Sequence, residues 1–396
     1  MPRKLKDWID SYLEYTSNQE SPEKLHLWCG FTVLSASLKR QVWLNRGYYK
    51  LFPNLYVLIV AESARIRKSS AMNIAVKLFN DSVSDGYYLK GKMTSEGLVT
   101  EMNRAKTVVK EGGRGGVMYD SHVFIHADEL ATLFGHDKNA ASRMATLLTE
   151  GYNCDDDYNH ITSGQGRKVL RNMYPVLLAA TDPRNLKVLP EDAVAGLTGR
   201  MLFITARDKR KAIAWPKLTD EDNEKRELLK NDLGYIATLQ GEFTVTPEAY
   251  DFFEEWYLAL SNKEGGDPHV DAFYERCHDT ALKVAMLISV SRSDSLVLDK
   301  SHMAGGITFI ERQLPEFSRV TNWVSTNVYA QNRARLIDLL RRSGGFSSRR
   351  TALKWLKIGL DELVVLEASL HTENTIKVTK EGNDFSYKLN KEELNR

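Results

Sequence analysis

The sequence predicts an α/β protein built on a parallel β-sheet with flanking helices, and three apolar segments carry that prediction. Residues 54–60 (NLYVLIV), 123–127 (VFIHA) and 175–181 (PVLLAAT) are short, mostly apolar runs. Runs of this length suit strands that are buried on both faces, as in a parallel sheet. Residues 71–79 (AMNIAVKLF), which follow the first run, have helical spacing. Strands that alternate with helices in this way favour an α/β architecture.

A polar loop follows the first apolar run and ends in Lys68 and Ser69, immediately before a helical segment. A strand, a loop, Lys-Ser and a helix in this order are typical of a phosphate-binding P-loop. Backbone N–H groups and the helix N-terminus would surround the phosphates, Lys68 would reach the β/γ oxygens, and Ser69 would bind Mg²⁺. An ordinary strand–loop–helix with an exposed lysine is the alternative. The expected nucleotide-binding residues are Ser63, Arg67, Lys68, Ser69 and Ser70.

This loop differs from the usual P-loop because the two glycines of the motif fall on Glu62 and Arg67. Glycine serves there because it adopts positive φ at low cost and lets the backbone approach a phosphate. Glu62 also adds a negative charge near a polyanion. The sequence therefore leaves open how fast a bound nucleotide is hydrolysed.

The two later apolar runs end in residues that suit phosphoryl transfer. Asp128 and Glu129 follow residues 123–127, and we expect Asp128 to hold Mg²⁺ and Glu129 to polarise the attacking water. Thr181 ends the third run and is expected to sense the γ-phosphate or orient water. Arg200 precedes a fourth apolar run, MLFIT, and is a candidate to stabilise charge on a neighbouring subunit's nucleotide. A solvated acidic turn is the alternative for Asp128 and Glu129. For Arg200 the alternative is a surface arginine, or one that pairs with a carboxylate of its own subunit.

These four elements resemble, in this order, the AAA+ ATPases, and in particular replicative helicases encoded by phages and plasmids. In that group the P-loop often reads Arg-Lys-Ser or Arg-Lys-Thr, as residues 67–69 do here. The resemblance covers about residues 20–310 and implies Walker A, Walker B, sensor 1 and arginine-finger roles for the residues described above. It also implies a helical lid, in which Arg276 would contact the γ-phosphate. A RecA-type core remains an alternative to AAA+.

The composition limits the possible compartments and partners. The chain has 396 residues and a formal net charge of +2, so nucleic acid binding would need a local basic surface rather than bulk charge. Its three cysteines lie far apart and form no CxxC motif, which favours a reducing cytosol over a zinc site. No apolar stretch is long enough to span a membrane, and the first residues lack the apolar core of a signal peptide. We therefore expect a cytoplasmic protein without membrane partners, in a bacterial host if a phage or plasmid encodes it.

Four segments are expected along the chain: helical residues 1–50, an ATPase core at 51–215, a helical lid and linker at 216–328, and a separate unit at 329–396. The pattern of the last segment predicts three helices followed by a β-hairpin, which is the order of a winged helix. Its third helix carries Asp361, Glu362 and Glu367. A helix that reads bases should be basic and polar on its outer face, so this order also suits protein docking.

A second hairpin is expected between the Asp-Glu strand and the Thr181 strand. DYNHIT and RKVLRNM flank the turn sequence SGQG. Ring helicases of the superfamily 3 and minichromosome-maintenance kinds carry a hairpin at this place, with a basic tip that grips DNA phosphates in the central pore. A surface hairpin with solvated charges is the alternative. The expected DNA-binding residues are His160, Arg167, Lys168 and Arg171.

Taken together, these features predict an ATP- and Mg²⁺-dependent DNA helicase that forms a homo-oligomeric, hexameric ring on single-stranded DNA and recruits other replication proteins such as a primase. One alternative is a nucleotide-dependent initiator or helicase loader with weak hydrolysis, which the altered P-loop favours. Another is a non-enzymatic DNA-binding or docking protein with a winged helix.

Overall fold

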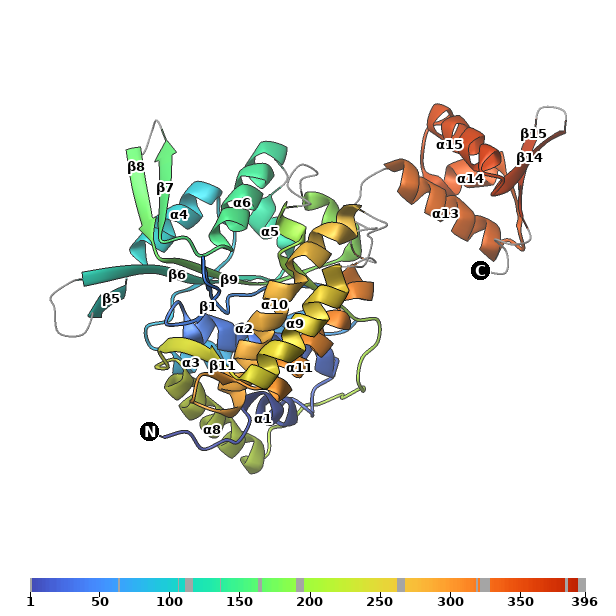
Figure 1. Cartoon of the computed structure of the whole chain (residues 1–396). Helices are drawn as coiled ribbons and strands as arrows, with labels where there is room; N and C mark the ends of the chain where they lie inside the picture. Colours follow the sequence, from blue (N-terminus) through green and yellow to red (C-terminus); the bar gives the residue numbers. More distant parts are fainter. Residues whose placement is uncertain are drawn as a thin grey trace. The chain divides into compact units, whose positions relative to one another are not determined.

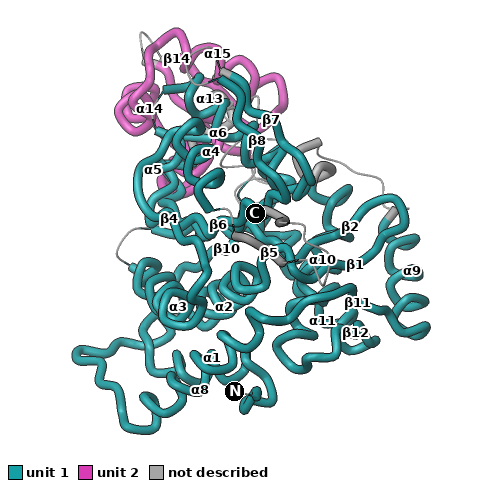
Figure 2. The backbone as a smooth tube through the Cα atoms, turned by 90° about the vertical axis from the view of Figure 1, so that its left-hand side faces the viewer, with its two compact units in different colours: residues 1–324 teal, residues 325–396 magenta. Residues whose placement is uncertain are grey.

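The computed structural model describes residues 2–62, 65–105, 107–110, 117–135, 137–162, 166–189, 196–261, 268–317, 320, 328–381 and 384–390 (Figure 1). The chain divides into two compact units, Met1–Val324 and Ser325–Arg396 (Figure 2). Each unit has its own hydrophobic core. No described helix has the length and apolar character needed to cross a membrane.

A five-stranded parallel sheet forms the centre of the first unit, as the apolar runs predicted. Its strands lie in the order β10–β3–β9–β6–β4. The strands are β3 (Tyr56–Val60), β4 (Tyr88–Lys90), β6 (Val117–Ala127), β9 (Met173–Thr181) and β10 (Met201–Thr205), and β5 (Thr107–Lys110) extends the sheet by pairing antiparallel with β6. All residues of β3, β9 and β10 are buried, which explains why the sequence shows no alternation there.

The order of the strands brings three predicted segments to one edge of the sheet. β9 lies between β3 and β6, with Val60 opposite Thr181 and Ala127 opposite Ala179. Because all three strands are parallel, the segments that follow them leave from the same carboxyl edge. The P-loop segment, Thr181 and the Asp-Glu pair therefore lie next to one another.

Helices cover both faces of this sheet (Figure 1). Helices α2 and α3 pack on one face, and α4, α5 and α6 pack on the other. A short 3₁₀ helix, η1 (Pro183–Val188), follows β9. The bounds are α2 (Glu23–Leu38), α3 (Lys68–Ser82), α4 (Ser95–Arg104), α5 (Leu130–Phe134) and α6 (Lys138–Gly151).

Residues from both ends of the first unit form a second, smaller sheet in the order β12–β11–β1–β2. Its strands are β1 (Val42–Asn45), β2 (Lys50–Leu51), β11 (Gly241–Val245) and β12 (Val297–Leu298). The parallel pairing of β1 with β11 joins the expected segment 1–50 to the expected segment 216–328. The surrounding helices are α1 (Trp8–Tyr15), α8 (Asp220–Ile236), α9 (Pro247–Ser261), α10 (Pro268–Arg292) and α11 (Lys300–Glu311).

The second unit contains three helices and a three-stranded sheet in the order β13–β15–β14. Ser348 caps α14 by accepting a hydrogen bond from the Thr351 N–H, a role for which serine is well suited. Gly344 and Gly345, both at positive φ, follow α13. The elements are α13 (Val328–Arg342), β13 (Phe346–Ser348), α14 (Arg349–Leu356), α15 (Leu360–Thr372), β14 (Ile376–Glu381) and β15 (Asp384–Leu389).

Candidate nucleotide site and hairpin

Three predicted residues meet at the carboxyl edge of the parallel sheet. Lys68 Nζ donates a hydrogen bond of 2.8 Å to the Thr181 carbonyl oxygen and another to the Ala61 carbonyl oxygen. The Thr181 hydroxyl group donates a hydrogen bond of 2.8 Å to Glu129 Oε1. Lys68, Thr181 and Glu129 follow three neighbouring strands, so the strand order itself produces this contact. A cation, a hydroxyl group and a carboxylate thus form one connected site.

Lys68 is a buried amine at this edge of the sheet. Its side chain is only 8% exposed, and burial lowers the pKa of its ammonium group, an effect that the nearby charges of Glu129 and Asp182 oppose. Its described hydrogen-bond partners are backbone carbonyls rather than a carboxylate. A buried cation is stabilised by an anionic partner, and a phosphate at this edge would supply one.

Arg67 takes the backbone conformation that glycine would provide in the usual motif. Its φ and ψ angles are 55° and 42°, in the left-handed region, and it immediately precedes α3. Its Nε donates a hydrogen bond of 2.8 Å to Glu20 Oε2. The left-handed region is costly for residues other than glycine, so Arg67 holds a strained conformation at the position where the usual motif has glycine.

The other predicted residues of the loop lie at its open end. Ser69 and Ser70 are exposed in the first turn of α3, where the helix N-terminus favours negative charge. Glu62 is also exposed and lies 3.8 Å from the Arg65 guanidinium group, which partly balances its charge. Ser63 lies outside the described residues.

Asp128 lies among polar neighbours that sequence reasoning did not identify. Lys90 Nζ is 2.6 Å from Asp128 Oδ2, and His126 Nε2 is 3.2 Å from Asp128 Oδ1. The other ring nitrogen of His126 forms a hydrogen bond of 2.7 Å with the Tyr88 hydroxyl group. Burial lowers the pKa of His126 to about 4, despite the opposing charge of Asp128. A neutral imidazole and a lysine therefore face this carboxylate.

Asp128 could serve the Mg²⁺ ion that the P-loop prediction implies only by giving up a present contact. Its Oδ1 lies 3.2 Å from His126 Nε2 and its Oδ2 lies 2.6 Å from Lys90 Nζ, so a cation or a water of its hydration shell would replace one of these groups. Among the described residues, no group of three or more His, Cys, Asp or Glu side chains could hold a metal ion. Magnesium would thus need phosphate oxygens besides Asp128 and Ser69, as in phosphoryl-transfer sites.

Arg200 lies at the opposite, amino edge of the sheet. It immediately precedes β10, whose first residue, Met201, pairs with Tyr56 at the start of β3. Five residues of β3 separate this edge from the P-loop, which is about 16 Å of strand. Arg200 Nη1 donates a hydrogen bond of 2.6 Å to the Gly196 carbonyl oxygen, while its buried Nε has no partner among the described residues. Burial and the charge of Arg276 lower the pKa of Arg200.

Arg276 also lies near the amino edge, and its expected contact with the γ-phosphate stays a prediction. It lines a cavity with Asn54, which precedes β3, and with Tyr152, which follows α6. The sheet therefore separates Arg276 from Lys68. Sequence reasoning placed Arg276 on a helix in the correct region, but the direction in which α10 packs decides which edge it reaches.

The expected hairpin is formed by β7 (Asp157–Thr162) and β8 (Gly166–Arg171), which pair antiparallel. In Figure 1 it projects from the body of the first unit, beside α4. The turn residues 163–165 lie outside the described residues. Gly166 has a φ of 68°, a conformation that favours glycine at this position.

The four predicted DNA-binding residues lie on two faces of this hairpin. Arg167 pairs with the exposed Ile161, and Arg171 pairs with Asp157, so both arginines share the outer face. Lys168 pairs with His160 on the opposite face, and its Nζ donates a hydrogen bond of 2.6 Å to Thr100 Oγ1 of α4. Alternation of side chains along each strand produces this division. The exposed basic character therefore comes from Arg167 and Arg171.

Arg40, which sequence reasoning did not identify, fixes the base of the hairpin. Its guanidinium group donates to the Cys154 carbonyl oxygen at 2.8 Å and contacts the side chains of Asn172 and Asp156. It also lies over the Phe52 ring, 4.5 Å from the centroid. Only the return of the chain after α2 brings these residues together, so no local sequence signal marks them.

The structure thus places Lys68, Thr181 and Glu129 in one contact, with Asp128 after the neighbouring strand. Arg200 and Arg276 lie at the other edge, and the hairpin is a separate feature. A comparison with protein-family models and with curated proteins found no match.

Proposed function

We propose that this chain is an ATP-hydrolysing DNA helicase or translocase of the AAA+ class, which acts as a ring on single-stranded DNA. The observation that carries the proposal is the hydrogen-bonded connection from Lys68 through Thr181 to Glu129 at one edge of the parallel sheet. Those are the groups that phosphoryl transfer needs: a cation for the phosphates, a hydroxyl group to sense them and a carboxylate for water.

In this proposal Lys68 leaves its carbonyl partners and contacts the β/γ oxygens of ATP. Glu129 orients a water molecule, accepts its proton as the new bond to the γ-phosphorus forms, and ADP leaves with the electrons of the broken P–O bond. Mg²⁺ would neutralise phosphate charge next to Asp128 and Ser69. The hydrogen bond from Thr181 holds the Glu129 carboxylate at the side of the site where the γ-phosphate would lie.

The position of Arg200 supports hydrolysis between subunits. With about 16 Å of strand between its edge and the P-loop, Arg200 cannot reach the nucleotide of its own subunit. In a ring, the amino edge of one subunit would face the carboxyl edge of the next, and Arg200 would stabilise transferring charge there. A closed, head-to-tail ring is the symmetric assembly that uses two different edges in this way. This placement also favours AAA+ over a RecA-type core.

The hairpin supports DNA as the substrate. Its outer face presents Arg167 and Arg171 on an element that projects from the body of the unit. Basic side chains on such an element grip phosphates without reading sequence. The second unit has the order of elements found in winged helices, but α15 exposes Leu360, Val364 and Val365. We assign it to docking of replication proteins, such as a primase, rather than to base readout.

A second candidate function is a nucleotide-dependent initiator or loader with weak hydrolysis. Arg67 favours it, because a bulky residue in the left-handed region replaces the glycine that lets the backbone approach a phosphate. The Lys68–Thr181–Glu129 contact favours hydrolysis instead. Turnover separates the two functions, since both require nucleotide binding.

The experiment measures ATP hydrolysis and ATP binding with and without single-stranded DNA. The helicase proposal predicts turnover that DNA stimulates, lost in Lys68→Ala and retained in Lys77→Ala, which changes an exposed lysine of the same helix. Binding without turnover would support the loader. Equal hydrolysis by Lys68→Ala and the wild type would refute the P-loop assignment.

The ring is tested by mixing two inactive variants. Arg200→Ala should bind ATP and hydrolyse it slowly, and Glu129→Gln should bind without turnover. Mixed assemblies contain some interfaces with an intact Glu129 and an intact Arg200, so part of the activity should return. No recovery in assemblies shown by mass to be mixed would contradict action between subunits.

A further inference from the structure

The turn between β1 and β2 presents two aromatic rings and two cations to solvent. Its sequence is Arg46-Gly47-Tyr48-Tyr49-Lys50. Tyr48 is fully exposed and Tyr49 about half exposed. Gly47 has a φ of 77°, which allows the tight turn that places both tyrosines at the tip. An exposed aromatic ring flanked by cations is the chemistry of a surface on which nucleic acid bases stack.

Contacts with neighbouring residues order the side chains of Arg46, Tyr49 and Lys50 in this turn. The Tyr49 hydroxyl group donates a hydrogen bond of 3.0 Å to Asp279 Oδ1 of α10. Lys50 Nζ lies 4.7 Å from the centre of the Trp43 ring, and the Arg46 guanidinium group lies 5.5 Å from the centre of the Phe253 ring. Side chains that are already ordered lose less entropy when they bind a ligand.

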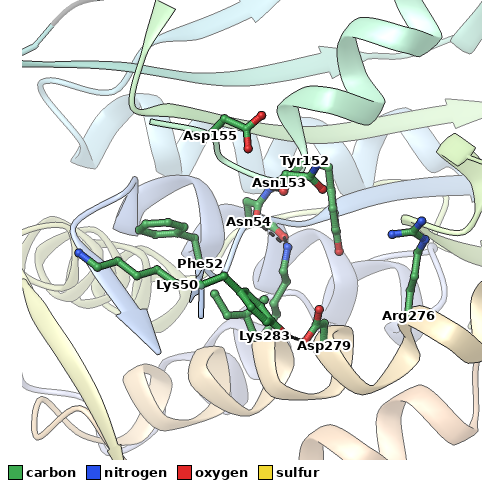
Figure 3. Close-up of a pocket in the computed structure, with 11 residues that line it drawn as sticks. Lys50, Phe52, Asn54, Tyr152, Asn153, Asp155, Arg276, Asp279 and Lys283 are labelled. Carbon is green, nitrogen blue, oxygen red and sulfur yellow. Dashed lines mark hydrogen bonds between the residues drawn. The ribbon is translucent and has the colours of Figure 1, made fainter. Parts of the chain in front are cut away.

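A cavity of about 290 Å³ begins at this turn (Figure 3). Tyr49 and Lys50 line it together with Arg276 from α10. Asn54, Asn153, Asp155 and Asp279 also line it. Amides and carboxylates can bond to the edges of bases, and the cations can bond to phosphates.

Lys283 gives this cavity a buried positive charge. Its side chain is 2% exposed, and Nζ donates to Asn54 Oδ1 at 2.6 Å and to the Asn54 carbonyl oxygen at 3.2 Å. The same atom lies 3.6 Å from the centre of the Tyr152 ring. Within the described residues, its contacts include no carboxylate. A buried cation with only neutral partners attracts an anion to the cavity.

The cavity adjoins the base of the β7–β8 hairpin. Asn153 and Asp155, which line it, belong to the segment that leads into β7. Arg40 fixes this same segment through the Cys154 carbonyl oxygen. Single-stranded DNA that binds to the outer face of the hairpin would therefore reach the cavity at the base of the hairpin.

We propose that the turn 46–50 and the adjoining cavity bind nucleotides of single-stranded nucleic acid, with bases stacked on Tyr48 and Tyr49 and phosphates near Lys50 and Arg276. This inference rests on the proposed binding of single-stranded DNA and adds the surface that receives the bases. Two ligands could use these cations: single-stranded nucleic acid, or the triphosphate of a nucleotide bound to a neighbouring subunit. The aromatic turn favours single-stranded nucleic acid, because a triphosphate needs cations but no stacking surface.

The first test measures the binding of a fluorescein-labelled single-stranded oligonucleotide of mixed sequence by anisotropy. Tyr48→Ala should weaken binding about tenfold, because one base can no longer stack, whereas Tyr48→Trp should bind at least as tightly as the wild type. Tyr250→Ala, which removes another exposed tyrosine from α9, is the control and should bind normally. Equal affinity of Tyr48→Ala and the wild type would overturn the stacking surface.

The second test repeats the titration at several salt concentrations. Lys50→Ala/Arg276→Ala should make the negative slope of log affinity against log salt shallower by about 0.7 for each phosphate that the variant no longer neutralises. Arg312→Ala removes an exposed arginine at the end of α11 and should leave the slope unchanged. An unchanged slope in the double variant would overturn the assignment of Lys50 and Arg276 to the phosphates.

Two further results separate this inference from the proposed function. If Arg167→Ala/Arg171→Ala abolishes DNA binding while the Tyr48 and Lys50/Arg276 variants bind normally, the helicase proposal stands and this inference fails. If Arg276→Ala binds DNA normally but hydrolyses ATP slowly in the assembled ring, the cavity faces a neighbour's nucleotide instead.

Discussion

The Thr181 hydroxyl group donates a hydrogen bond of 2.8 Å to Glu129 Oε1, and the Thr181 carbonyl oxygen accepts one of the same length from Lys68. One residue at the end of β9 thus contacts both the expected P-loop lysine and the expected catalytic carboxylate. Because β9 lies between β3 and β6, a change in the position of Lys68 on phosphate binding would pass through Thr181 to the Glu129 carboxylate.

Thr181→Val should slow ATP hydrolysis while leaving ATP binding nearly unchanged. Valine has the shape of threonine but cannot donate to Glu129, and the loss of a hydrogen bond to a charged group predicts a decrease in kcat of at least about tenfold. Thr181→Ser keeps the hydroxyl group and should restore most of the rate. Steady-state kinetics and nucleotide titration measure both effects. Equal rates for the valine variant and the wild type would remove Thr181 from the mechanism.

The two faces of the hairpin predict different effects on DNA binding. Arg167→Ala/Arg171→Ala should weaken binding of single-stranded DNA of every sequence and reduce its salt dependence, because both charges lie on the outer face. Lys168→Ala should have a smaller effect, since Lys168 contacts Thr100 of α4. Anisotropy titrations at several salt concentrations compare the variants. A larger loss of DNA affinity in Lys168→Ala than in the double variant would mean that the DNA strand passes between the hairpin and α4.

Arg67→Gly should be more stable than Arg67→Ala by about 1 kcal/mol. Neither variant can form the hydrogen bond to Glu20, so the comparison isolates the cost of the left-handed conformation, which only glycine adopts freely. Urea unfolding of the two variants measures the difference in free energy. Equal stabilities would show that the position carries no backbone strain.

The lowered pKa of Glu20 predicts that the folded protein loses stability at acidic pH. Hydrogen bonds from Lys209, Arg67 and the Ile213 N–H lower its pKa from 4.5 to about 2. A carboxyl group whose pKa falls on folding stabilises the folded state above its unfolded pKa, and that contribution disappears as the pH decreases from 4.5 towards 2.

Glu20→Gln should therefore be less stable than the wild type near neutral pH. The difference between the two proteins should shrink below pH 4.5 and vanish near pH 2. Thermal unfolding across this range measures it. A difference that is independent of pH would mean that the ionised carboxylate contributes nothing.

The sequence predicted the parts of this molecule that depend on local patterns. β3 and β9 are apolar throughout because both faces are buried, and Lys68 begins α3 where the change from apolar run to helical spacing placed it. The β7–β8 pair follows from the turn sequence between its strands. These features require information from only a few neighbouring residues.

Features that depend on packing between distant segments could not be predicted in this way. The edge reached by Arg276 depends on how α10 packs, and the contacts of Arg40 depend on the return of the chain after α2. Tyr88 and His126 meet because β4 and β6 are neighbours, which no motif encodes. The left-handed conformation of Arg67 also went unrecognised, because the sequence shows only that glycine is missing.

ATP hydrolysis by Glu129→Gln in the presence of single-stranded DNA tests the account most directly. The amide keeps the size of the side chain and can still contact Thr181, but it cannot accept the proton of the attacking water. The account predicts that this variant binds ATP with nearly wild-type affinity and loses DNA-stimulated turnover, whereas Glu255→Gln, at an exposed position of α9, retains it. Wild-type turnover by Glu129→Gln would contradict the assignment of the catalytic site.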